Sequence, residues 1–196
     1  DMVGGPQIRN IGTIGGNTCN GVTSADSAST LHAYDAIMEI TGPDGVRTVP
    51  IHDFYISAGK VDLKHGELLT SILIKKESYE NYYGHYIKYA MRNAMDIATT
   101  GCSANVKLSD DKKTIVSARI AYGVAAPVPI RAKSAEEFLN GKEATAENIA
   151  VFAKKALDDV NPRTSWRASK ELRLQLIEEL SKRAMTEAVR LAGGEI

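Results

Sequence analysis

The stretch between residues 9 and 26 constrains the fold most, because it offers little apolar surface from which to build a core. Four glycines fall within ten residues, separated by small hydroxyl and amide side chains: Gly12, Gly15, Gly16 and Gly21. Glycine lets the backbone take positive φ angles and brings bare N–H groups close to a ligand. Two interpretations follow, a ligand-binding loop or an ordinary turn before a helix. The spacing matches neither a G-x-G-x-x-G fingerprint nor a Walker P-loop.

The first half of the chain has the pattern of a small α+β unit. A helix is expected over residues 24–35, and its N-terminal dipole would suit a phosphate or an electron-rich ring beside the glycine stretch. Residues 37–40 and 46–49 read as two short strands, and the Gly-Pro-Asp-Gly turn between them predicts a hairpin. A further strand is expected over residues 68–74.

Antiparallel strands and then helices are expected in the second half. The strands lie near residues 86–91, 101–108 and 115–124, with a polar hairpin tip at 109–113. Three helices follow: one capped by Ser134, with Glu137 at capping-box spacing, one beginning at Thr145, and a long one from about residue 165 to 191. The predicted fold class is α+β, with a partial α+β lobe over residues 1–80 and an antiparallel sheet packed on helices over residues 84–196.

Charge and cysteine content exclude several classes of function. The 24 basic and 24 acidic residues leave no basic excess for a nucleic-acid or anionic-membrane partner. Cys19 and Cys102 are too few for an iron–sulfur cluster or a structural zinc site. No apolar run approaches the roughly 20 residues that span a bilayer, and the chain opens without the basic-then-apolar start of a signal peptide. Sparse cysteine use fits a reducing compartment, so a cytoplasmic location is expected.

Neither a catalytic residue nor a metal ligand is predicted. The four histidines are scattered over segments of different type, and each is expected to be structural because a site needs convergent partners: His32, His52, His65 and His85. Cys19 lies inside the glycine stretch, either near a ligand or as a small space-filling residue. A protein without an acid–base set still takes part in redox catalysis when a cofactor carries the chemistry.

Several uncommon sequence blocks, in one order along most of the chain, resemble the FAD-binding flavoprotein subunit of the xanthine dehydrogenase family of molybdenum hydroxylases. They are residues 7–17 with 24–26, then 86–92, 94–98, 123–131 and 165–171. The first block resembles the second FAD-contacting segment of that subunit. The resemblance implies that residues 1–80 form an FAD-contacting subdomain. It also implies that residues 84–196 form a domain like the C-terminal domain of CO dehydrogenase flavoprotein.

The resemblance assigns contacts with FAD to eight residues. The family's glycine loop, which contacts FAD through backbone amides and an asparagine side chain, corresponds to Thr13, Ile14, Gly15, Gly16 and Asn17. Three further positions match a hydrogen bond to the sugar-like portion of FAD, an apolar contact with adenine and a lysine near the cofactor: Asp26, Leu69 and Lys88 respectively.

Three other residues in the matching blocks keep two interpretations. Arg92 and Asp96 either contact the flavin or form a structural ion pair at adjacent strand ends. Trp166 opens the last expected helix, where we expect it to anchor the helix in the core, although a functional role is the alternative.

Family subunits carry an N-terminal lobe with a separate glycine-rich loop around the FAD pyrophosphate, and residues 1–8 contain no such loop. The resemblance therefore implies that this chain is the C-terminal portion of such a subunit and shares FAD with a missing N-terminal lobe. We expect the chain alone to bind FAD weakly.

The implied activity is that of one subunit of an oxidoreductase, inactive alone. Electrons released by xanthine or hypoxanthine hydroxylation would pass from [2Fe–2S] clusters through FAD to NAD. Molybdopterin and the clusters would belong to partner subunits. Nicotinate, carbon monoxide, an aldehyde or an aromatic CoA thioester are alternative substrates. A docking module without flavin is the alternative from another functional class.

Overall fold

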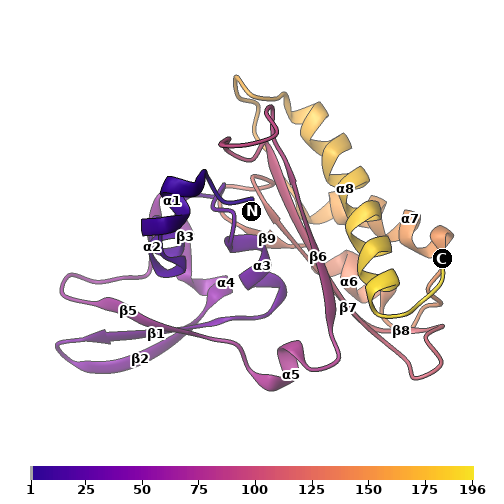
Figure 1. The fold of residues 1–196 in the computed structure, drawn as a ribbon, viewed down its shortest axis with the longest axis horizontal. Coiled ribbons are helices and arrows are strands. Elements are labelled where there is room, and N and C mark those ends of the chain that lie inside the picture. The colour runs from indigo at the N-terminus through magenta and orange to yellow at the C-terminus, as the bar shows by residue number, and fades with distance from the viewer. Residues whose placement is uncertain (1) are drawn as a thin grey trace.

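Two hydrophobic cores organise residues 2–196, the part of the chain that the computed structural model describes (Figure 1). The first core contains buried apolar side chains between residues 25 and 55. The second contains those between residues 102 and 192. Each core lies against an antiparallel sheet, and helices accompany both sheets. The predicted α+β class, with a small lobe followed by a sheet packed on helices, is confirmed.

The first lobe combines a three-stranded antiparallel sheet with short helices. The sheet has the order β2-β1-β5, and its strands are β1 (Ile37–Gly42), β2 (Gly45–Pro50) and β5 (Leu68–Leu73). The remaining elements are α1 (Pro6–Ile11), α2 (Ile14–Cys19), α3 (Ala28–Ala33), α4 (Ile51–Phe54), β3 (Tyr55–Ser57) and β4 (Lys60–Val61). Gly42 pairs with Gly45, so Pro43 and Asp44 form a two-residue turn and the predicted hairpin is confirmed.

The second lobe is built on a four-stranded antiparallel sheet of order β6-β7-β8-β9. Its strands are β6 (Tyr83–Tyr89), β7 (Thr100–Leu108), β8 (Ile115–Gly123) and β9 (Ile130–Arg131). Its helical elements are α6 (Lys133–Leu139), α7 (Ala146–Lys155), the 3₁₀ turn η1 (Ala156–Asp159) and α8 (Lys170–Leu191). The short helix α5 (Lys76–Tyr79) joins the two lobes.

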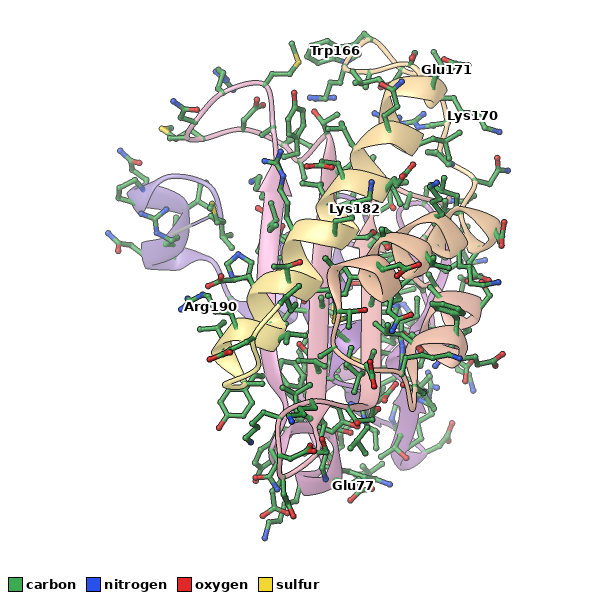
Figure 2. All side chains as sticks on the ribbon, turned by 90° about the vertical axis from the view of Figure 1, so that its right-hand side faces the viewer. Glu77, Trp166, Lys170, Glu171, Lys182 and Arg190 are labelled. Carbon is green, nitrogen blue, oxygen red and sulfur yellow. The ribbon has the colours of Figure 1, made fainter. Side chains whose placement is uncertain are left out.

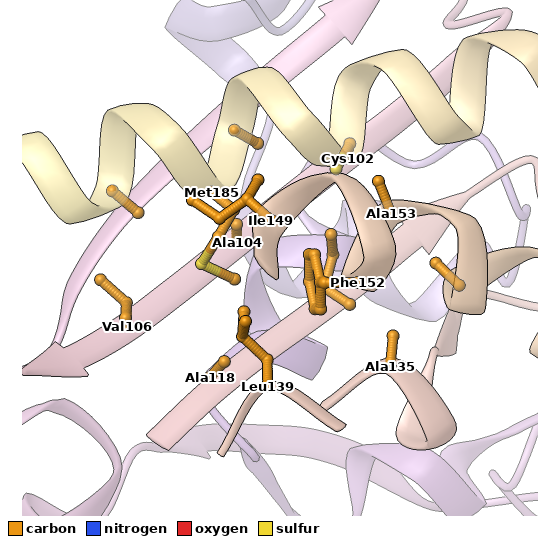
Figure 3. Close-up of a cluster of buried hydrophobic side chains, with 14 of the residues drawn as sticks. Cys102, Ala104, Val106, Ala118, Ala135, Leu139, Ile149, Phe152, Ala153 and Met185 are labelled. Atoms are coloured by element: carbon orange, nitrogen blue, oxygen red, sulfur yellow. The ribbon is translucent and has the colours of Figure 1, made fainter. Parts of the chain in front are cut away.

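Strand β7 is covered on both faces. Helix α8 packs against β6 and β7, while α3 of the first lobe also contacts β7 and β8 (Figure 1). A strand covered on both faces loses the usual alternation of buried and exposed residues, and nearly every residue of β7 is buried. Figure 3 shows Ile149 and Phe152 of α7 and Met185 of α8 packed above the sheet residues Ala104 and Ala118. The first lobe is therefore docked directly on the sheet of the second.

A cluster of charged side chains joins the two lobes. The guanidinium of Arg131 donates to the carboxylates of both Asp35 and Glu136, with 2.6 Å from Arg131 Nη2 to Glu136 Oε2. The ring of His52 contacts Asp35 at 2.8 Å, and Arg119 Nη1 lies 3.4 Å from the same carboxylate. Burial alone would raise the pKa of Asp35. The His52 hydrogen bond and the two arginines outweigh it and hold that pKa below its usual range. Asp35 is therefore ionised near neutral pH and links both lobes.

Two helix boundaries differ from the sequence prediction. Helix α3 covers residues 28–33 rather than 24–35, because turns occupy the residues just before it. Ser134 lies inside α6 and is not its cap. Its hydroxyl donates to Asp159 at 2.6 Å, and the N-cap is Ala132, whose side chain makes no cap hydrogen bond. The capping box with Glu137 is therefore wrong.

The last helix also begins later than predicted. Helix α8 begins at Lys170, five residues beyond the expected start, and Ser169 caps it by accepting from the backbone N–H of Leu172. Trp166 lies in the turn before the helix with 77% of its surface exposed, so the prediction that it anchors the core is wrong. The predicted end at the glycine pair is confirmed, since Gly193 follows the C-cap Ala192 with φ at +87°. No helix in residues 2–196 has the length and apolar character needed to cross a membrane.

Candidate cofactor site

The glycine stretch folds as the short helix α2 rather than as an open loop. Thr13 caps it, because its hydroxyl accepts from the backbone N–H of Gly16 at 2.9 Å. Two glycines in the first turn leave free space beside the backbone. A Cβ on Gly15 would meet no atom within 4 Å, and one on Gly16 would approach only Thr13 Oγ1 at 3.1 Å. The backbone of α2 therefore stays open to approach by a ligand.

A cavity of about 600 Å³ lies between α1 and α2. Its lining mixes apolar side chains with backbone and polar groups: Val3, Ile8, Arg9, Ile11, Gly12, Thr13, Ile14, Gly16, Asn17 and Ser27. The isoleucines of both helices that line it are largely exposed. Ligand sites commonly combine an apolar lining with a few placed polar groups. The cavity has that character and includes four of the eight predicted cofactor residues.

Asn17 fixes how α2 meets α3. Its side-chain oxygen accepts from the backbone N–H of Ser27 at 3.2 Å and from the Ser27 hydroxyl at 2.5 Å. This satisfies a backbone donor at the start of α3, where N–H groups have no partner inside the helix. The Asn17 carbonyl is therefore occupied by the protein, and its amide NH₂ group is the part available to a ligand.

Asp26 and Lys88 form a buried ion pair between the lobes. Lys88 Nζ lies 2.9 Å from Asp26 Oδ2, and the two side chains are 6% and 11% exposed. Lys88 also donates to the carbonyl of Met2 at 2.9 Å. The Tyr86 hydroxyl donates weakly to Asp26 Oδ1 at 3.4 Å, and burial together with the Asp26 charge raises the Tyr86 pKa above its usual range. Asp26 is not among the residues that line the larger cavity.

A second cavity, of about 340 Å³, adjoins Lys88 and the loop between β6 and β7. Arg92 and Asp96 line it and form an ion pair at 3.4 Å within that loop. Asp96 also accepts from the backbone N–H groups of Arg92 and Ile97, so its carboxylate shapes the loop. Met2 and Gly4 line this cavity while Val3 lines the larger one, so residues 2–4 separate the two.

The remaining predicted residues lie apart from these groups. Gly15 belongs to α2 but not to the cavity lining. Leu69 lies on β5, half-buried against the first core, and β5 contacts α2. The structure thus brings Thr13, Ile14, Gly16 and Asn17 to one cavity and places the Asp26–Lys88 pair and Leu69 elsewhere. The sequence analysis did not find Tyr86 or Ser27, although Tyr86 stands two residues before Lys88, on the same face of a strand.

His32 and Cys19 line neither of these two cavities. His32 is 1% exposed and its Nδ1 contacts the carbonyl of Ala28 at 2.8 Å, with the His52 ring 5.2 Å away. Burial raises the pKa of the Cys19 thiol, which leaves it a poor nucleophile. Among residues 2–196, His, Cys, Asp and Glu side chains form no group of three that could hold a metal ion. The mixed apolar and polar lining of the larger cavity is suited to holding a ligand.

Two protein families match consecutive parts of the chain. Residues 1–75 match the FAD binding domain in molybdopterin dehydrogenase, and residues 85–188 match the CO dehydrogenase flavoprotein C-terminal domain. The larger cavity, α2 and Asp26 lie within the first match. Lys88 and the β6–β7 loop lie within the second.

Curated relatives and solved structures agree with these matches. The chain is 46% identical over 194 residues to the xanthine dehydrogenase FAD-binding subunit of Escherichia coli O157:H7, covering 99% of this chain and 66% of that protein. It is 29% identical to the glyceraldehyde dehydrogenase medium chain of Sulfolobus acidocaldarius, covering 94% of this chain and 64% of the relative. A structure of carbon monoxide dehydrogenase from Hydrogenophaga pseudoflava superimposes with a TM-score of 0.89 at 28% identity. That match covers 98% of this chain and 65% of the other. The chain thus spans about two thirds of the length of these relatives.

Proposed function

The chain belongs to the family of FAD-binding flavoprotein subunits found in molybdenum hydroxylases such as xanthine and carbon monoxide dehydrogenase, and from this premise we propose that it holds FAD within a multi-subunit oxidoreductase. We propose residues 1–80 as an FAD-contacting subdomain and residues 84–196 as the flavoprotein C-terminal domain. The proposal rests on the cavity beside α2, because this cavity lies within the residues that match the FAD-binding family and is bordered by open glycine backbone. FAD would supply electron transfer between [2Fe–2S] clusters on a partner subunit and NAD.

The described residues fit such a cofactor. Gly15 and Gly16 leave the backbone of α2 uncovered, and the isoleucines beside them offer apolar surface to a ring. The NH₂ group of Asn17 donates where its carbonyl is already engaged by Ser27. Lys88 and Asp26 hold each other in fixed positions, one as a donor and one as an acceptor. Leu69 contributes an apolar contact from β5.

The substrate of the whole enzyme is proposed to be a purine such as xanthine or hypoxanthine. The support is the difference in sequence identity. The chain is 46% identical to a xanthine dehydrogenase subunit, but only 28% identical to a carbon monoxide dehydrogenase medium chain and 31% identical to a nicotinate dehydrogenase subunit. The molybdopterin-binding and [2Fe–2S] subunits would be partners. Assays of the purified complex with xanthine, nicotinate, carbon monoxide and an aldehyde distinguish the substrates, and NAD reduction identifies the acceptor.

The flavin assignment is tested by Gly16→Val in the complete enzyme. A branched side chain at Gly16 would lie in the cavity and crowd Thr13 Oγ1, so we expect flavin per protein, read from visible absorbance, to fall at least several-fold. Asn20→Ala is the matched control, since Asn20 is the exposed C-cap of the same helix and does not line the cavity. Unchanged flavin content in a folded Gly16→Val complex would refute the assignment.

A further inference from the structure

One face of strand β6 is turned towards the first lobe. Tyr86 and Lys88 lie on this face together, because alternate side chains of a strand point to the same side. Ser103, the partner of Tyr86 on β7, donates from its hydroxyl to the Thr30 hydroxyl of α3 at 3.2 Å, so α3 covers the same side. Figure 2 shows the other side of the sheet, where α8 lies over β6 and β7. Tyr86 and Lys88 therefore extend from the second lobe towards the first.

These two side chains engage opposite oxygens of one carboxylate. Lys88 Nζ lies 2.9 Å from Asp26 Oδ2, and the Tyr86 hydroxyl lies 3.4 Å from Asp26 Oδ1. The Asp26 side chain is only 11% exposed, so the protein surrounds most of it. The last torsion of an aspartate side chain is broad, so one contact at Oδ2 leaves the carboxylate plane free to turn. A second donor, at Oδ1, fixes that plane.

Strand β7 leaves the space that the Tyr86 ring occupies. Gly101 pairs with Lys88 across the two strands. A Cβ on Gly101 would come within 3.2 Å of the Tyr86 hydroxyl oxygen and 3.5 Å of a ring carbon. A glycine inside a strand often marks such a close approach by another group. Burial raises the Tyr86 pKa and the Asp26 charge raises it further, so the hydroxyl keeps its proton and donates a hydrogen bond.

Asp26 adjoins the larger cavity through the next residue of the chain. Ser27 lines that cavity, and its backbone N–H and hydroxyl both donate to the side-chain oxygen of Asn17. The backbone beside Asp26 is thus held from the first lobe, and its carboxylate is held from the second. An ionised carboxylate has about four lone-pair positions and donates nothing. With these contacts made, Asp26 still has positions that accept from the hydroxyl groups of a ligand.

We propose that Tyr86 is a positioning residue of the cofactor site. It acts through Asp26, whose carboxylate it orients to accept from the hydroxyl groups in the sugar-like portion of FAD. The inference rests on the proposed function, in which FAD lies beside α2 and Asp26. Loss of the Tyr86 hydroxyl therefore weakens the binding of a flavin with a hydroxyl-bearing chain and spares the binding of the flavin ring alone.

The test measures FAD binding to the flavin-stripped complete enzyme by the quenching of flavin fluorescence. Tyr86→Phe removes one oxygen and keeps the ring, and urea denaturation checks that the fold is retained. We expect its dissociation constant for FAD to rise about threefold to tenfold, the range for one hydrogen bond. Lumiflavin, which is the flavin ring without the hydroxyl-bearing chain, should bind with unchanged affinity. Tyr83→Phe is the matched control and should bind both as the wild type does, because Tyr83 is on the same strand, is 46% exposed and lines neither cavity.

Asp26→Ala separates positioning from a purely structural role of Tyr86. If the hydroxyl acts through the carboxylate, adding Tyr86→Phe to Asp26→Ala should change the FAD affinity by less than about twofold, whereas independent effects would multiply. Wild-type FAD affinity of Tyr86→Phe, or equal losses for FAD and lumiflavin, would overturn the positioning role. Weakened FAD binding in Asp26→Ala and Gly16→Val would then leave the proposed function standing. Wild-type affinity in all three single variants would overturn both.

Discussion

Acidification should destabilise the protein through His32, which lies between the lobes. Burial is the largest cause lowering its pKa, to about 4 from the ordinary 6.5. The nearby charges of His52 and Arg131 lower it further, while the Ala28 hydrogen bond and Asp35 raise it. The folded state therefore keeps His32 neutral where the unfolded state binds a proton. The contribution of His32 to stability is lost as pH falls from about 6.5 towards 4, and it changes no further below pH 4.

The magnitude follows from the two pKa values. A tenfold difference in proton affinity corresponds to about 1.4 kcal/mol, so the full loss between pH 6.5 and pH 4 is about 3 kcal/mol. At pH 5 linkage gives about 2 kcal/mol relative to pH 7.5. Native proteins are stable by only about 5–15 kcal/mol, so the effect is a large fraction of the total.

Urea denaturation at pH 7.5 and pH 5.0 measures this loss in the wild type, His32→Gln and His65→Gln. His32→Gln keeps an amide donor for the Ala28 carbonyl but removes the titration, so its stability difference between the two pH values should be smaller by about 2 kcal/mol. His65 lies in an exposed loop, and His65→Gln should behave as the wild type. An unchanged pH difference in His32→Gln would refute the role of this buried ring.

Two further changes test the structure. Arg131→Met leaves the buried Glu136 with only the longer Lys133 ion pair and removes the link to Asp35, so it should lower the free energy of unfolding by about 3–5 kcal/mol; a loss below about 1 kcal/mol in urea denaturation would contradict the inter-lobe role. Ser169→Ala removes the N-cap of α8 and should cost about 1 kcal/mol in the same assay. Ser165→Ala, at the start predicted from sequence, should not show a cap effect, although it loses the Arg173 contact.

Local sequence signals predicted those elements whose stabilising contacts are themselves local. The Gly-Pro-Asp-Gly turn sets the β1–β2 register, and the Thr145 hydroxyl accepts from Asn148 within one helical turn. The predicted start of α8 was wrong because the sequence offers two serines, Ser165 and Ser169, as possible N-caps. Ser165 is instead used by Arg173, eight residues along the chain. A pattern of residue types does not show which serine a distant side chain will engage.

The site was harder to predict because its geometry depends on contacts far apart in sequence. The resemblance identified Asp26 and Lys88 separately, but their ion pair spans 62 positions and forms only when the lobes dock. The glycine stretch was expected as a loop, since glycine disfavours helices. The Thr13 cap and the Asn17–Ser27 contact nevertheless hold it as α2. No local sequence pattern predicts the charged cluster around Asp35, because its members come from both lobes.

Amide hydrogen exchange in the complete enzyme, with and without its flavin, tests the central claim most directly. If FAD lies against α2 and the Asp26–Lys88 pair, adding it to flavin-stripped enzyme should slow exchange in peptides covering residues 10–20 and 84–92. Exchange in α7, which lines neither cavity, should be unchanged. Protection confined to other segments, with residues 10–20 exchanging equally fast in both states, would contradict the assignment of this site.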